Sequence, residues 1–217
     1  MSLRINDVAP DFTAESTEGS ISWHEWIGES YAILFSHPKD FTPVCTTEFG
    51  ALARLSPEFA KRGTKLAGIS IDPVEEHMRW KADIEKTSGA AVTFPIIADP
   101  RLEIAKLYDM LPADAWLPDG HTANDTATVR TTFIIGPDKR IRLQLIYPMS
   151  VGRNFKEILR ALDAIRLADG APLATPADWY PGEDVIVALS LSDDEARARF
   201  GEMEMLLPYL RKTRAPG

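Results

Sequence analysis

The chain has 217 residues with 24 basic and 32 acidic side chains, so its formal net charge is −8. This length suits one domain, or one domain with a small appendage, and a hydrophobic share of 45% is enough for a sizeable core. A pI near 5.1 argues against nucleic acid or an anionic membrane as the main partner, and a single cysteine excludes an intramolecular disulfide and any metal site built on several cysteines.

The first half of the chain alternates apolar runs, typical of buried strands, with helical patterns. The predicted elements are a strand over 31–36, a helix from Cys45, a strand over 65–71, a helix over 74–86, a strand over 92–97 and a helix capped by Asp99 that runs to about Tyr108. We expect Pro57 to break or kink the helix that starts at Cys45, with Ser56 as the cap of a further helical segment.

The second half begins with a stretch that has no clear period. Residues 111–128 predict a long loop. A loop of that length in a compact domain is usually functional, or it contains a helix or strand whose pattern is too weak to recognise. Residues 129–135 and 141–147 then predict an antiparallel pair joined by a turn at 136–139. Residues 154–168 carry an apolar stripe at helical spacing and give the clearest helix of the chain.

The order of these elements predicts a central sheet covered by helices, mostly parallel with an antiparallel edge. A proline-rich stretch over 172–182 then indicates a linker, and the strand over 185–189 and helix over 193–200 offer too little apolar surface to stand alone. We therefore predict an α/β protein with a thioredoxin-like fold and a mixed central sheet over residues 1–168. Residues 169–217 would form a small C-terminal α+β extension.

Cys45 lies between a proline-bearing loop and the start of a predicted helix. A thiol in the first turn of a helix meets free backbone N–H groups and the positive end of the helix dipole, which favour the nucleophilic thiolate. Thr42 could place its hydroxyl beside the sulfur and bind a small substrate such as a peroxide, while Pro38 would limit water. Each residue taken alone also has a plain structural explanation, since single cysteines are often buried and Thr and Pro are common in turns.

The pattern Pro-x-x-x-Thr-x-x-Cys at 38–45 is the active-site signature of peroxiredoxins. With His37 before the proline, the surrounding segment resembles the one-cysteine subgroup of that family. Arg130, which opens a predicted strand, matches the active-site arginine of the family. Gly-Arg-Asn-Phe at 152–155 and Thr-Pro-Ala-Asp-Trp at 175–179 also resemble the subgroup, so the similarity extends over nearly the whole chain.

The resemblance implies a thiol-dependent peroxidase that serves antioxidant defence and cell redox homeostasis by reducing hydrogen peroxide and organic hydroperoxides. The Cys45 thiolate would attack a peroxide oxygen and become a sulfenic acid. Arg130 would stabilise the thiolate and the charge on the leaving oxygen, and Thr42 would align the O–O bond. Glu48 and Arg153 would hold Arg130 in place. Because the chain has no second cysteine, an external thiol or another small reductant would have to reduce the sulfenic acid.

The resemblance also implies a homodimer, which could assemble further, with the C-terminal extension packed across the partner. No apolar run reaches the roughly 18 residues of a membrane span. The first ten residues lack the features of a signal peptide, so we expect a cytoplasmic protein without a membrane or nucleic-acid partner. None of the four histidines shows metal-ligand spacing with another, and we predict neither a metal nor another cofactor.

Two alternative hypotheses use the same cysteine. His37 could form a nucleophilic Cys–His pair with Cys45, as in thiol hydrolases. No neighbouring residue identifies the third group that would orient the histidine, so we expect His37 to line the peroxide pocket instead. A redox sensor or holdase chaperone is the non-enzymatic alternative. A sensor would stay oxidised until a specific partner acts, whereas a peroxidase turns over with excess thiol.

A third hypothesis comes from the phospholipase A2 activity ascribed to mammalian members of the subgroup. Ser30, His24 and Asp138 match its proposed site. The lipase-like pattern is incomplete, because Ala32 replaces its second glycine and Ser30 precedes a strand rather than a strand-to-helix turn. We therefore expect a phospholipase A2-like activity to be minor at most.

Overall fold

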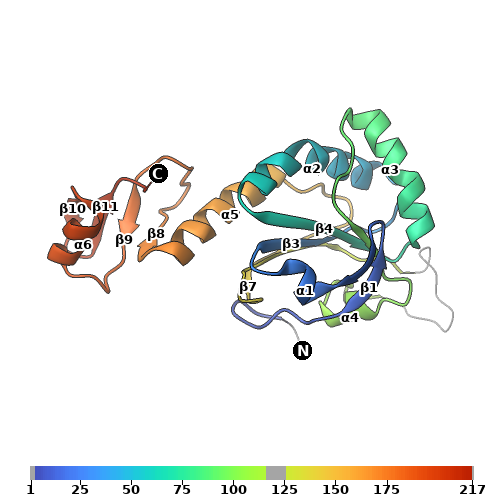
Figure 1. Cartoon of the computed structure of the whole chain (residues 1–217), viewed down its shortest axis with the longest axis horizontal. Coiled ribbons are helices and arrows are strands. Elements are labelled where there is room, and N and C mark those ends of the chain that lie inside the picture. Colours follow the sequence, from blue (N-terminus) through green and yellow to red (C-terminus); the bar gives the residue numbers. More distant parts are fainter. Residues whose placement is uncertain (1–2, 116–125, 217) are drawn as a thin grey trace. The chain divides into compact units, whose positions relative to one another are not determined.

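The computed structural model describes residues 3–115 and 126–216 (Figure 1). Contacts between residues divide the chain into two units, Met1–Phe155 and Lys156–Gly217. The loop predicted over 111–128 includes residues 116–125, which lie outside the described residues. Among the residues described, no helix combines the length and the apolar character needed to span a bilayer.

The first unit is built on one seven-stranded sheet. Its strands are β1 (Thr13–Ser16), β2 (Gly19–Ser22), β3 (Tyr31–Ser36), β4 (Thr64–Ser70), β5 (Ile96–Ala98), β6 (Arg130–Ile135) and β7 (Ile141–Tyr147), and their spatial order is β2-β1-β5-β4-β3-β6-β7. Only the β3–β4 and β4–β5 pairs are parallel, while the other four pairs are antiparallel.

The sheet is mixed, as predicted, but the expectation that it would be mostly parallel was wrong. The sequence pattern missed the β1–β2 hairpin, because strands of four residues are too short to show a period. A tight turn joins antiparallel neighbours, whereas parallel neighbours need a crossover such as a helix. Together with the β1–β5 and β6–β7 pairs, the hairpin and the antiparallel β3–β6 pair make four antiparallel pairs against two parallel ones.

Helices cover both faces of this sheet (Figure 1). They are α1 (Trp23–Ile27), α2 (Pro43–Lys61), α3 (Val74–Ser88) and α4 (Glu103–Leu107). α2 and α3 lie on one face, and α1 and α4 lie on the other (Figure 1). Asp99 accepts hydrogen bonds from the backbone N–H groups of Glu103 and Ala105, at 2.9 and 2.7 Å, so it caps α4 as the sequence predicts.

α2 is a single helix, so the expectation of a new helical segment at Ser56 was wrong. Pro57 lies inside the helix and cannot donate a backbone hydrogen bond to the carbonyl of Ala53. The hydroxyl of Ser56 donates to that same carbonyl at 3.0 Å and replaces the missing bond. The helix therefore continues through the proline.

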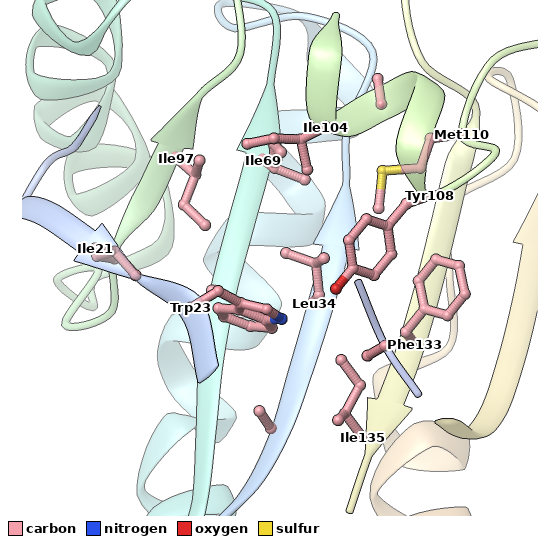
Figure 2. Packing of buried hydrophobic residues seen from close by; sticks show 14 of the residues in the cluster. Ile21, Trp23, Leu34, Ile69, Ile97, Ile104, Tyr108, Met110, Phe133 and Ile135 are labelled. Atoms are coloured by element: carbon pink, nitrogen blue, oxygen red, sulfur yellow. The ribbon is translucent and has the colours of Figure 1, made fainter. Parts of the chain in front are cut away.

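The face covered by α1 and α4 carries the main hydrophobic core (Figure 2). Leu34, Ile69 and Phe133 project from the central strands into this core, since alternate strand residues point to opposite faces. Trp23 and Tyr108 fill the space beside them and are fully buried. Figure 2 shows these side chains converging on one face of the sheet.

The opposite face positions α2 through aromatic packing. The rings of Phe35 and Phe49 lie 5.2 Å apart, and Phe94 lies 5.8 Å from Phe35 and 5.9 Å from Phe49. Gly68 of β4 makes this approach possible, because a Cβ atom there would lie 2.7 Å from Cζ of Phe49. Phe49 follows Cys45 by one helical turn, so the same packing fixes the start of α2 on the sheet.

The second unit contains a small sheet of its own. Its elements are α5 (Phe155–Gly170, whose first residue closes the first unit), β8 (Leu173–Ala174), β9 (Val185–Val187), α6 (Asp193–Phe200), β10 (Glu204–Leu207) and β11 (Leu210–Thr213), with strand order β10-β11-β9-β8. The sequence predicted β9 and α6 but missed the other strands, because β8 has two residues and every residue of β10 is exposed.

The division between the units follows Phe155, the first residue of α5, whereas the sequence places a domain boundary near the end of that helix, at 168/169. Ala164 and Leu167 of α5 pack against the small core of the second unit, which includes Trp179, Val185 and Val187. This packing assigns most of α5 to the second unit. The domain boundary drawn from composition remains a prediction.

We expect Gly68→Ala to lower the free energy of unfolding by about 1–3 kcal/mol, because the added methyl group would overpack the layer between β4 and α2. Urea unfolding would measure the change. Gly170→Ala is the matched control, since a Cβ atom there meets nothing within 4 Å. Equal stability of the two variants would contradict the tight α2 packing.

Candidate active site

The first turn of α2 contains Cys45. The helix starts at Pro43, slightly before the predicted start, and Thr42 is its N-cap residue. Backbone N–H groups in this turn lack intrahelical acceptors and lie at the positive end of the helix dipole, so they favour a nearby anion. Cys45 is a free cysteine with an exposed fraction of 0%. Its sulfur is therefore held away from bulk water.

Arg130, the first residue of β6, reaches this sulfur. Its Nη1 atom lies 3.3 Å from Sγ of Cys45. The other side of the guanidinium donates two hydrogen bonds, from Nε at 2.8 Å and from Nη2 at 2.6 Å, to the carbonyl oxygen of Met149. Because a guanidinium is always protonated, Arg130 brings a fixed positive charge to the buried thiol.

Glu48, one turn after Cys45, connects two buried arginines. Its Oε2 atom accepts from Nη1 of Arg130 and from Nη2 of Arg153, both at 2.8 Å. Its Oε1 atom accepts from Nε and from the backbone N–H of Arg153, at 2.9 and 2.8 Å. Arg153 therefore acts on Arg130 through Glu48, whose carboxylate holds the Arg130 guanidinium in place.

The charge state of Glu48 follows from two opposing effects. Burial by itself would raise the pKa of Glu48, but the hydrogen bonds and charge of Arg153, with the charge of Arg130, hold that pKa below its usual value of 4.5. Arg153 is fixed in turn by hydrogen bonds to the carbonyl of Thr131 and the hydroxyl of Thr132, at 3.1 and 3.2 Å. The Arg–Glu–Arg group therefore stays ionised.

The loop between β3 and α2 carries the other two residues of the sequence motif. Pro38 is buried, and Thr42 is half-buried at the helix start. The Thr42 hydroxyl donates to the carbonyl of Lys39 at 2.8 Å, which leaves its oxygen lone pairs available to accept a hydrogen bond from a ligand. Phe41, between them, has a positive φ of 55° and is exposed.

A buried histidine–aspartate–histidine group lies beside this loop, and sequence reasoning missed it. Nε2 of His37 is 2.7 Å from one Asp40 oxygen, and Nδ1 of His77 is 2.6 Å from the other. Asp40 lies inside the signature and could have been suspected as a partner of His37. His77 comes from α3, and no local pattern connects it to the motif.

The thiol-hydrolase hypothesis can be compared with this geometry. Asp40 supplies a group that orients His37, which the sequence did not identify. Nδ1 of His37, however, has no hydrogen-bond partner among the described residues, so a Cys45–His37 hydrogen bond is not formed there. The sulfur contacts the guanidinium of Arg130 instead. This arrangement favours a site in which Arg130 stabilises the thiolate over one in which His37 activates the thiol.

A cavity of about 660 Å³ lies next to the motif loop, between α2 and α3. Thr42 and Trp80 contribute to its walls, and Arg54 and Lys86 supply positive charge. The Trp80 ring also stacks on His37 at 5.1 Å, and its Nε1 atom donates to the hydroxyl of Thr46. Trp80 therefore separates the cavity from the buried histidine.

The residues that match a phospholipase A2 site have other partners. The ring of His24 lies 2.8 Å from the carbonyl of Ala9, and the Asp138 carboxylate accepts from Arg142 at 3.0 Å. Ser30 immediately precedes β3 and is not on a strand-to-helix turn. These contacts give no support to a phospholipase A2-like activity.

Known protein families match both units. Residues 5–144 match the AhpC/TSA family, and residues 164–202 match the C-terminal domain of 1-Cys peroxiredoxin. A 1-Cys peroxiredoxin of Dictyostelium discoideum is 45% identical over 215 residues, which cover 99% of this chain and 86% of the relative. The chain belongs to the peroxiredoxin family, in its 1-Cys subgroup.

Solved structures of peroxiredoxins have the same fold. The C45S mutant of the peroxiredoxin 6 of Arenicola marina matches with a TM-score of 0.91 and 42% identity, over 99% of each chain. A structure of the yeast mitochondrial 1-Cys peroxiredoxin matches with a TM-score of 0.87 and 46% identity, over 98% of this chain and 99% of that one. The predicted thioredoxin-like fold with a C-terminal extension is confirmed.

As a peroxiredoxin, the protein is an enzyme, a thiol peroxidase and oxidoreductase. The matched AhpC/TSA stretch includes Cys45, Glu48 and Arg130, whereas Arg153 lies between the two matched stretches. The structure brings all four residues together around one buried thiol. Their individual roles remain predictions.

We expect Glu48→Gln to lower the free energy of unfolding by about 3–5 kcal/mol, because two buried arginines would lose their anionic partner. Since the native pKa of Glu48 lies below 4.5, its stabilising contribution is present above that pH and is lost as the pH falls through the native value. The difference between wild type and variant should therefore shrink in acid. Urea unfolding at several pH values would measure it.

Glu58→Gln is the matched control on the same helix. Glu58 forms exposed pairs with Lys61 and Arg62, at 2.6 and 3.1 Å, so its replacement should hardly change the unfolding midpoint at neutral pH. A Glu48→Gln protein as stable as this control would show that the buried carboxylate does not hold the arginines.

Proposed function

We propose that the protein reduces hydrogen peroxide and organic hydroperoxides through a sulfenic acid on Cys45. The observation that carries this proposal is the contact of 3.3 Å between the Arg130 guanidinium and Sγ of Cys45, in the first turn of a helix. The thiolate forms a bond to one peroxide oxygen, the O–O bond breaks, and its electron pair leaves with the other oxygen. That oxygen takes up a proton and departs as water or an alcohol.

Each neighbouring group has a physical part in this step. Arg130 places positive charge beside the sulfur and the leaving oxygen, where charge develops in the transition state. Thr42 offers oxygen lone pairs at the helix start, so it can accept a hydrogen bond from the peroxide and orient it. Glu48 and Arg153 restrict the guanidinium to one orientation, because both carboxylate oxygens are engaged.

We propose that an external thiol completes the cycle. Cys45 is the single cysteine of the chain, so the sulfenic acid condenses with an outside thiol to a mixed disulfide and water, and a second thiol then releases Cys45. Glutathione/thioredoxin systems are connected with thiol resolution in the yeast mitochondrial 1-Cys peroxiredoxin, which supports a reductant of this class. When thiol is scarce, further oxidation to sulfinic acid competes.

We also propose a homodimer in the cytoplasm. β7 is an edge strand of the seven-stranded sheet, and Ile146 on it is 58% exposed, which supports pairing with a second copy. The compartment rests on the sequence alone, and the yeast relative is mitochondrial. Neither statement affects the chemistry proposed for Cys45.

The reaction of the reduced protein with hydrogen peroxide tests the proposal. We expect a second-order rate constant several orders of magnitude above that of a free thiol, measured by stopped-flow tryptophan fluorescence, and its complete loss in Cys45→Ser. Turnover with excess thiol would separate a peroxidase from a sensor that oxidises once. A wild-type rate no higher than that of a free thiol would refute the function.

Arg130→Lys should lower this rate constant by about 100-fold, because lysine keeps the charge but cannot contact the sulfur, Glu48 and the Met149 carbonyl together. Arg140→Lys is the control, since Arg140 is exposed and bonds the carbonyl of Asn6. Similar rates for the two variants would remove Arg130 from the reaction.

A further inference from the structure

The cavity of about 660 Å³ between α2 and α3 takes no part in the proposed reaction with peroxide. The two helices lie next to each other on one face of the sheet (Figure 1). They touch closely where Gly50 meets Ser88, because a Cβ atom on Gly50 would lie 2.7 Å from Cβ of Ser88. Direct contacts between two helices therefore hold the walls in place, and the volume lies in the range of small-molecule sites.

The charged side chains that line this cavity are two cations and one anion. Arg54 comes from α2, and Asp83 and Lys86 come from α3. Within the described part of the chain, the side chains of Asp83 and Lys86 have no hydrogen-bond or ion-pair partner. Arg54 donates from Nη1 to the carbonyl of Ser88 at 3.2 Å, which leaves most of its five N–H donors available. The charges therefore complement a ligand with two anionic groups and one cationic group.

Two threonine hydroxyls on the wall offer only acceptor lone pairs to a ligand. The hydroxyl of Thr46 donates to the carbonyl of Thr42 at 2.8 Å and accepts from Nε1 of Trp80 at 3.1 Å. The hydroxyl of Thr47 donates to the carbonyl of Val44 at 2.7 Å. Each hydroxyl has one proton and two lone pairs, so at least one lone pair of each remains. These oxygens suit the N–H groups of a peptide or an ammonium.

The cavity also adjoins the reacting cysteine along α2. Thr42, Pro43 and Thr46 line it, and they flank Cys45 in the first turn of the helix. Neighbouring Cα atoms lie about 3.8 Å apart, so the backbone of Cys45 is one residue away from the wall. Its sulfur is buried, so an external thiol reaches it only when this turn opens. An extended tripeptide spans about 10 Å, which is enough to reach from the cavity to that turn.

We propose that this cavity binds the reductant, a small peptide thiol that carries two carboxylates and one ammonium group. This rests on the proposed function. Arg54 and Lys86 bind the carboxylates, and Asp83 binds the ammonium group. The thiol sulfur then forms a bond to Sγ of the Cys45 sulfenic acid, the S–O bond breaks, and the hydroxyl leaves with the thiol proton as water. A second thiol attacks the reductant sulfur of this mixed disulfide and releases the Cys45 thiol.

Binding can be measured without any redox step. S-methylglutathione carries these three charges but has no free thiol. We expect isothermal titration calorimetry of the full-length reduced protein to show one site, weakened about ten-fold in Arg54→Gln and in Lys86→Gln, because each variant loses a charge-assisted hydrogen bond. Lys61→Gln is the matched control, since it removes the same charge from α2 outside the cavity. No binding by wild type at millimolar concentration, or the same weakening in Lys61→Gln, would overturn the site.

Asp83→Asn tests the partner of the ammonium group. This variant should bind S-methylglutathione about ten-fold more weakly than wild type. N-acetyl-S-methylglutathione has no ammonium group, so the variant and wild type should bind it equally. An equal loss of affinity for both peptides would show that Asp83 does not bind the ammonium group.

The reduction step tests whether binding serves Cys45. Protein oxidised by one equivalent of hydrogen peroxide is mixed with glutathione or with the uncharged thiol β-mercaptoethanol, and mass spectrometry follows the sulfenic acid that remains after trapping with dimedone. We expect the ratio of the glutathione to the β-mercaptoethanol rate constant to fall by about ten-fold in Lys86→Gln and to stay at the wild-type value in Lys61→Gln. The same ratio in both variants would refute the role in reduction.

The outcomes separate this proposal from the proposed function. If Cys45 forms no sulfenic acid with peroxide, the proposed function falls, and calorimetry still decides whether the cavity binds the peptide. If the sulfenic acid forms and a thioredoxin-type protein reduces it but glutathione does not, the function stands and the cavity is not a reductant site.

Discussion

The contact between Glu48 and two buried arginines is the constraint on which the rest of the site depends. An arginine side chain has many rotamers, and the one adopted by Arg130 places Nη1 3.3 Å from Sγ of Cys45. Glu48 and the Met149 carbonyl fix that rotamer from two sides. Burying these charges costs free energy, which their mutual attraction offsets only with good geometry, so the site requires a rigid frame.

The fold supplies that frame through one aromatic layer. Phe35 and Phe49 fix α2 against β3 and β4, and Gly68 lets the helix approach closely. Arg153 lies over Phe35, with its guanidinium carbon 5.4 Å from the ring centroid. The aromatic layer that positions Cys45 therefore also packs against Arg153. Aromatic packing and the charge of the arginine stabilise the same geometry.

Sequence reasoning found the parts of the site that lie close together in the chain. A proline-bearing loop followed by a helical pattern indicated a helix start at Cys45, and the helix begins two residues earlier, at Pro43. The family resemblance pointed to Arg130. Sequence reasoning did not identify His77, because this residue comes from a helix distant in the chain. It did not identify the Met149 carbonyl either, because a backbone atom leaves no side-chain pattern. The sequence pattern also missed the β1–β2 hairpin and did not predict that antiparallel strand pairs would outnumber parallel ones. Both features depend on which short segments pair, and periodicity does not report that.

Two buried polar networks, one at the thiol and one beside the loop that precedes it, keep their charge around neutral pH. The pKa of Glu48 is held below its usual value by arginines that do not titrate, and the pKa of Asp40 is held at about 2 by two histidines. The pKa of His37 is lowered by burial, so that ring is neutral at and above neutral pH. Around neutrality none of these three groups changes charge. The carboxylate that holds Arg130 beside Cys45 therefore keeps its charge in that range.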